Sequence, residues 1–141
     1  MSIVINRPIE EVFAVLADLE NDIKWRSEWV ETQNLSEEPV GIGSTFRLTG
    51  VFLCRRIPTT YELIEFKPNQ IVAWKTVSGP LPLKFQRSFE RAEGGTRSSI
   101  NYFIEARGFF RLILSLLGGM VKRQHQGDLR KLKELLETHA L

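Results

Sequence analysis

The spacing of hydrophobic residues changes several times along the chain. Residues 2–5 form a short apolar run, and Pro8 then stands where the first turn of a helix accepts proline. Apolar residues between 12 and 16 recur at helical spacing, and a second short helical turn is expected at 20–26. From residue 30 onward, alternating and β-branched runs predict strands at 30–35, 45–54, 57–66, 70–77, 83–92 and 96–107. The turns between these strands are short, so neighbouring strands must be antiparallel.

The last segment, 109–138, returns to a helical period. One apolar stripe runs along it through Phe110, Leu114, Leu117, Val121, Leu132 and Leu135. The stripe stays in register across Gly118 and Gly119, which favours one long helix although each glycine costs about 1 kcal/mol relative to alanine inside a helix. Two interpretations of the glycine pair stay open. The pair leaves space for a cavity or a close neighbour, or it marks a local kink without function.

The order of these elements defines the fold class. It predicts an α+β protein in which an antiparallel sheet of about seven strands wraps around a long C-terminal helix, with two short helices after the first strand. At 141 residues the chain has room for one domain, 1–141, and none for a second.

Charge and cysteine content narrow the classes of function. The first 40 residues carry 3 Lys or Arg and 9 Asp or Glu, and the remaining residues carry 16 and 8. No single element concentrates the basic excess, so we expect no nucleic-acid partner. Cys54 is the only cysteine, which excludes an intramolecular disulfide and a thiolate metal cluster within one chain. A cytoplasmic location is therefore expected.

No segment has the pattern of a secretory signal or a membrane span. The first residues lack a basic start followed by a continuous apolar stretch. The most apolar run, 109–121, has 13 residues and contains Arg111, whereas a helix needs about 20 residues to cross a bilayer.

A series of short motifs then occurs in a consistent order: residues 5–13 (INRPIEEVF), Asp18, Trp25, 41–44 (GIGS), 61–68 (YELIEFKP), Ala73-Trp74, Gly95-Thr96 and 129–137 (LRKLKELLE). In their order and spacing the motifs resemble the START-like or birch-pollen-allergen-like superfamily (SRPBCC), and within it the polyketide cyclase/dehydratase-like branch. The resemblance implies a helix-grip fold with a cavity between the curved sheet and the first half of the terminal helix, suited to an apolar small molecule. It implies little about chemistry, because carriers, receptors and cyclases share this fold.

Three polar residues interrupt apolar faces and are candidates for the cavity. Arg87 alternates with Phe85 and Phe89, so it points to the same side as they do. There it either holds a ligand's carboxylate, phosphate or enolate oxygen, or pairs with Asp128 or a nearby glutamate. Gln124 and Asp128 interrupt the helical stripe. In one interpretation Gln124 hydrogen-bonds a ligand, and Asp128 acts as an acid or base or orients Arg87. In the other, Asp128 anchors the N-terminal loop or lies where the stripe reaches the surface.

Aromatic residues complete the expected lining. Tyr102 lies on the more apolar face of its strand, whereas Tyr61 and Trp74 fit either face, and Trp25 and Trp29 either cover one mouth of the cavity or pack in the core. We expect the ligand cavity to be lined by Trp25, Tyr61, Trp74, Phe85, Arg87, Tyr102, Leu117, Met120, Val121, Gln124 and Asp128.

The residues define no catalytic constellation. The two histidines, His125 and His139, have no nucleophile or metal-ligand set at a recognisable spacing, so we expect no metal and no cofactor. The leading hypothesis is a module that encloses an apolar or aromatic small molecule, lipid-like or polyketide-like. A second is a cyclase or dehydratase that uses Arg87, Tyr102 or Asp128. A third is a membrane or protein interaction module formed by Phe109, Phe110, Leu112 and Leu116 with Arg111, Lys122 and Arg123.

Overall fold

The structure is a computed structural model of residues 1–141. It describes the chain except for residues 37–39, 53, 80–81, 105–108 and 140–141. It describes the backbone but not the side chains of residues 52, 109–111, 113–118 and 121.

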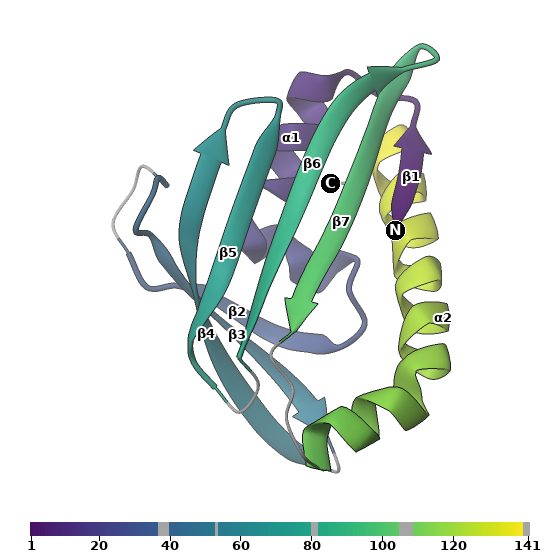
Figure 1. Cartoon of the computed structure of the whole chain (residues 1–141). Coiled ribbons are helices and arrows are strands. Elements are labelled where there is room, and N and C mark those ends of the chain that lie inside the picture. The colour runs from purple at the N-terminus through teal and green to yellow at the C-terminus, as the bar shows by residue number, and fades with distance from the viewer. Residues whose placement is uncertain (37–39, 53, 80–81, 105–108, 140–141) are drawn as a thin grey trace.

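One curved antiparallel sheet forms the body of the molecule (Figure 1). Its seven strands lie in the order β1-β7-β6-β5-β4-β3-β2, so that the first strand sits at one edge beside the last. The strands are β1 (Ser2–Ile5), β2 (Trp29–Asn34), β3 (Thr45–Phe52), β4 (Arg55–Lys67), β5 (Ile71–Ser78), β6 (Leu83–Ala92) and β7 (Gly95–Ile104). Each expected strand is present within a few residues of its predicted bounds.

Two short helices connect β1 to β2. Helix α1 (Ile9–Leu16) follows Pro8, which stands at its N-cap, and buries Val12 and Leu16 against the sheet. The 3₁₀ helix η1 (Leu19–Lys24) begins at Asp18, whose side chain accepts a hydrogen bond from the Glu20 backbone N–H at 2.9 Å. These elements confirm the α+β prediction with two short helices after the first strand.

Helix α2 (Phe109–Glu137) is one continuous helix, as its apolar stripe predicted. Figure 1 shows that it changes direction in its first half, a bend of the kind that a glycine pair permits. A Cβ atom added to Gly119 would meet nothing within 4 Å. The interpretation of a close neighbour therefore finds no support at Gly119, whereas the kink interpretation agrees with the bend.

The packed core fills only part of the space under the sheet. The second half of α2 contributes Leu129, Leu132 and Leu136, which pack with α1 and with the sheet residues Leu63 and Val72. Lys133 fixes this half of α2 to the sheet edge, because its Nζ donates to the Val4 carbonyl at 2.7 Å. These core residues do not fill the region under the preceding turns of α2, and a pocket lies there.

Candidate functional site

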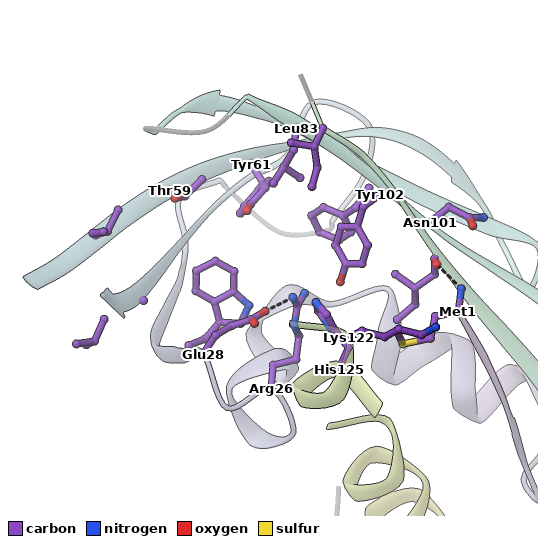
Figure 2. Close-up of a pocket in the computed structure, with 17 residues that line it drawn as sticks. Met1, Arg26, Glu28, Thr59, Tyr61, Leu83, Asn101, Tyr102, Lys122 and His125 are labelled. Carbon is purple, nitrogen blue, oxygen red and sulfur yellow. Dashed lines mark hydrogen bonds and ion pairs between the residues drawn. The ribbon is translucent and has the colours of Figure 1, made fainter. Parts of the chain in front are cut away.

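A pocket of about 710 Å³ opens between the sheet and α2 (Figure 2). Its volume lies in the range of small-molecule sites in proteins. Among the described residues, most of the wall comes from strands β3, β4, β6 and β7, and α2 contributes Lys122 and His125. The lining residues are Met1, Arg26, Glu28, Trp29, Gly50, Val51, Ile57, Thr59, Tyr61, Leu83, Phe85, Ile100, Asn101, Tyr102, Ile104, Lys122 and His125.

One wall of the pocket depends on a close approach between β2 and β3. Trp29 pairs with Gly50, and the register shifts directly after it, between Trp29 and Glu31. A Cβ atom on Gly50 would lie 3.1 Å from the Glu28 carbonyl oxygen and 3.4 Å from the Trp29 ring. The glycine therefore lets residues 28 and 29 lie close against β3, where both line the pocket.

Four side chains form a polar cluster in the mostly apolar pocket: Arg26, Glu28, Tyr102 and His125. Arg26 is buried, and its Nη2 donates to Glu28 Oε1 while its Nη1 lies 3.6 Å from Asp22 Oδ2. The Arg26 guanidinium also lies 6.0 Å from the centre of the Tyr102 ring. Figure 2 shows the Tyr102 hydroxyl pointing toward Arg26 and His125. Neither that hydroxyl nor Arg26 Nε has a hydrogen-bond partner among the described residues.

Burial shifts the pKa of three side chains that line the pocket: Tyr61, Tyr102 and His125. It raises the pKa of the Tyr61 and Tyr102 phenols above their usual value. Burial also lowers the pKa of His125, and the positive charge of Arg26 lowers it further. Both phenols are therefore protonated and His125 is neutral at pH 7. The charge inside the polar cluster is carried by Arg26 and Glu28.

Arg87 points inward, as predicted, but its guanidinium is occupied by other protein groups. It donates two hydrogen bonds to Asp22, at 3.0 and 2.6 Å, and one to the Leu16 carbonyl at 2.8 Å. Both side chains are fully buried. The expected partner, Asp128 or a glutamate, was wrong: the acid comes from η1. Arg87 is not among the residues that line the pocket.

Trp25 and Trp74 are both buried beside Arg87 and do not line the pocket. Their rings lie 5.3 and 5.2 Å from the Arg87 guanidinium carbon. Trp74 also stacks on Phe85, with 4.9 Å between ring centres. Since Phe85 lines the pocket, Trp74 supports its wall.

Gln124 and Asp128 meet at Ser27, in the loop between η1 and β2. The Ser27 hydroxyl donates to Asp128 Oδ1 at 3.0 Å and accepts a hydrogen bond from Gln124 Nε2, also at 3.0 Å. The two residues thus anchor the segment that carries Arg26 and Glu28, in agreement with the anchoring interpretation. Neither of them lines the pocket.

The remaining helical candidates separate into two groups. Met120 is 71% exposed. The side chains of Leu117 and Val121 lie outside the described part of the chain, as do those of Phe109, Phe110, Arg111 and Leu116 from the third hypothesis. Leu112, Lys122 and Arg123 are exposed. Over the described residues, no helix combines the length and the apolar character that crossing a bilayer requires.

The pocket thus combines three expected residues with others that sequence reasoning missed. Tyr61, Phe85 and Tyr102 were expected and line it. Arg26, Glu28, Thr59 and His125 were not. One signal was present: Arg26 lies between Trp25 and Trp29 in the sequence, and its guanidinium carbon stands 5.8 and 5.6 Å from the centres of their rings.

Comparison with known proteins supports the same architecture. The model of a family described as polyketide cyclase/dehydrase and lipid transport matches residues 1–137. A search of curated proteins finds no match.

Similar solved structures share the fold at low sequence identity. The Zhui aromatase/cyclase from a Streptomyces species has a TM-score of 0.75 at 15% identity, covering 100% of this chain and 93% of that one. TTHA0849 from Thermus thermophilus has a TM-score of 0.76 at 18% identity, covering 100% and 97%. Ara h 8.0201 has a TM-score of 0.73 at 16% identity, covering 98% and 95%.

These structures confirm the helix-grip fold. With the family model extending from the first strand to the end of the terminal helix, the chain belongs to the polyketide cyclase/dehydrase and lipid transport family.

Proposed function

We propose that this protein binds an apolar, aromatic small molecule in the pocket between the sheet and α2. The observation that carries the proposal is the pocket itself, whose volume of about 710 Å³ has walls that are mostly apolar. Aromatic side chains stand edge to face within it: Tyr61 lies 6.4 Å from Trp29 and 5.3 Å from Phe85, ring centre to ring centre. Such edges and faces suit a flat aromatic guest.

Burial of the guest's surface supplies most of the affinity. Each Å² of apolar surface removed from water contributes about 25 cal/mol, so a guest that buries roughly 400 Å² gains about 10 kcal/mol before the costs of association. Those costs take a large part of the gain, which places the expected dissociation constant in the micromolar range.

The test is a titration with Nile red, an uncharged apolar dye, followed by fluorescence. We expect the wild-type protein to bind the dye and Ile57→Trp to bind it much more weakly, because the larger side chain fills the pocket. Val77→Trp is the matched control, since Val77 is on β5, is half exposed and does not line the pocket. Equal binding by the two variants would contradict the proposal. Native mass spectrometry of protein from its own host would identify the natural guest.

A second candidate, a cyclase or dehydratase, is favoured by one observation. The neutral imidazole of His125 lies 5.3 Å from the Tyr102 ring, at the wall of the pocket. A neutral imidazole can accept a proton from a carbon next to a carbonyl, and a protonated phenol can donate one to the oxygen. Of the residues first considered for catalysis, Tyr102 lines the pocket, whereas Arg87 and Asp128 do not.

The catalytic candidate is tested with a poly-β-carbonyl substrate. We expect His125→Ala to abolish turnover while Nile red still binds. Turnover that survives both His125→Ala and Tyr102→Phe would remove the catalytic candidate and leave the binding function standing.

A further inference from the structure

Two arginine–carboxylate pairs lie in and near the pocket wall, and a third carboxylate, Asp128, is buried at Ser27. Arg87 and Asp22 form a pair in which neither side chain is exposed. Arg26 and Glu28 form a second pair, with 6% and 28% of their side chains exposed. The first pair lies behind the wall and the second lines the pocket. Among the described lining side chains, Lys122 is the other charged one, and it is exposed to solvent.

We propose that the pocket selects an uncharged guest that carries a ketone, ester or phenol oxygen, and that Glu28 is the residue that excludes carboxylates. The inference rests on the proposed binding function and adds the chemical class of the guest. Glu28 acts on specificity by occupying Arg26, which among the described lining side chains is the buried cation that an anionic guest would otherwise use.

A guest carboxylate would be costly to bury in this pocket. A carboxylate that enters an apolar pocket loses its water, and it remains there only if a cation replaces that water. Arg26 is the buried cation in the wall, and its Nη2 already donates to Glu28. A guest carboxylate beside Arg26 would therefore face the Glu28 carboxylate as well, and like charges at such short range repel.

The pocket wall instead offers hydrogen-bond donors to an uncharged guest. The Tyr102 hydroxyl and Arg26 Nε are buried and have no hydrogen-bond partner among the described residues. Figure 2 shows that the Tyr102 hydroxyl points toward Arg26 rather than away from the polar cluster. A buried donor without a partner is costly, and a carbonyl or phenol oxygen of the guest removes that cost without adding charge. The polar cluster is thus complementary to a neutral oxygen.

The experiment compares two probes of nearly equal shape, 2-acetylanthracene and 2-anthracenecarboxylate. The methyl group of the first is replaced by a charged oxygen in the second. We expect the wild-type protein to bind the ketone at least about tenfold more tightly, as measured by fluorescence titration. The preference should persist at about 0.5 M salt, because Arg26 is buried and Glu28 is partly buried beside it, and salt screens such charges only weakly.

Glu28→Gln tests the residue. Glutamine keeps the size of the side chain and an oxygen that can accept from Arg26, but it removes the negative charge. We expect the ratio of ketone to carboxylate affinity to fall by about tenfold or more, through tighter binding of the carboxylate. Glu31→Gln is the matched control: Glu31 lies on β2 shortly after Glu28, pairs with Arg56 at the surface and does not line the pocket, so the ratio should stay at its wild-type value.

The outcomes separate the two proposals. If Nile red and both anthracenes fail to bind, the binding function is refuted and the selectivity falls with it. If Nile red binds but both anthracenes fail, the guest class assigned here is wrong. Equal wild-type affinity for the two probes, or a ratio that Glu28→Gln leaves unchanged, would refute the role of Glu28 while the binding function stands. The wild-type ratio needs no variant, so the inference remains testable even if Glu28→Gln does not fold.

Discussion

Breaking the ion pair between Asp22 and Arg87 should be among the most destabilising single changes available in this protein. Asp22→Leu leaves the Arg87 guanidinium with no exposed surface and with the Leu16 carbonyl as its remaining acceptor. Removing one partner of a buried ion pair costs about 3–5 kcal/mol, because the other charge stays buried without compensation. Folded domains have about 5–15 kcal/mol of stability in total, so the loss is a large share of it.

Removing Arg87 instead of Asp22 should lower the free energy of unfolding by less. Arg87→Met leaves Asp22 with Arg26, whose Nη1 already lies 3.6 Å from the Asp22 carboxylate. The remaining charge is therefore partly compensated, and we expect a loss of about 1–3 kcal/mol. The double variant replaces the pair by apolar side chains, so it should be more stable than Asp22→Leu alone.

The assay is urea unfolding followed by tryptophan fluorescence, with the melting temperature as a second measure. At about 2–4 °C per kcal/mol, Asp22→Leu should melt roughly 10 °C below the wild-type protein. Arg91→Ala is the control, because the pair of Arg91 with Glu10 is exposed and its loss should leave the free energy of unfolding unchanged. Additive effects of the two core changes, with no recovery in the double variant, would refute the account of the buried pair.

Three further predictions concern titration and the helix. Tyr61 and Tyr102 are the two tyrosines of the chain, and burial raises the pKa of both, so the native protein should show less tyrosinate absorbance than the unfolded chain at about pH 10, where half of free tyrosine is ionised. Burial lowers the pKa of His125, so below about pH 6.5 the unfolded chain takes up a proton that the folded state resists. Stability should therefore fall as pH drops from about 7 to 5, and His125→Gln should make the free energy of unfolding less dependent on pH in that range; an unchanged slope would contradict this account. Gly119→Ala should raise stability by up to about 1 kcal/mol, because the added methyl group meets nothing within 4 Å, whereas a lower melting temperature would show that the bend requires glycine.

The sequence predicted the fold because its signals are local. Alternation along β6 placed Phe85, Arg87 and Phe89 on one face, and all three are buried. The short turns required antiparallel pairing, and the apolar stripe predicted that α2 continues across Gly118 and Gly119. Each of these inferences needs only the spacing of residues within one element.

The candidate site was less predictable because its contacts join distant segments. Asp22 is 65 residues from Arg87 and lies in a 3₁₀ helix, whose short length gives no periodic signal. Arg26 and Glu28 lie in a segment that Gly50 and Ser27 position, and neither effect is visible from residue types alone. His125 sits on the helix beside polar neighbours, and the bend of α2 and the curvature of the sheet together place it beside Tyr102.

The pairing of β1 with β7 affects how the protein folds during its synthesis. Ser2 to Ile5 pair with Ser99 to Thr96, and the Asn6 backbone N–H donates to Glu137 Oε1 at 3.1 Å. During synthesis β1 therefore emerges well before β7, the strand with which it pairs, and such long-range pairing slows folding. Until β1 and β7 have paired, the facing edge of β7 is open to other chains, so we expect nascent protein to depend on chaperones until this pair forms.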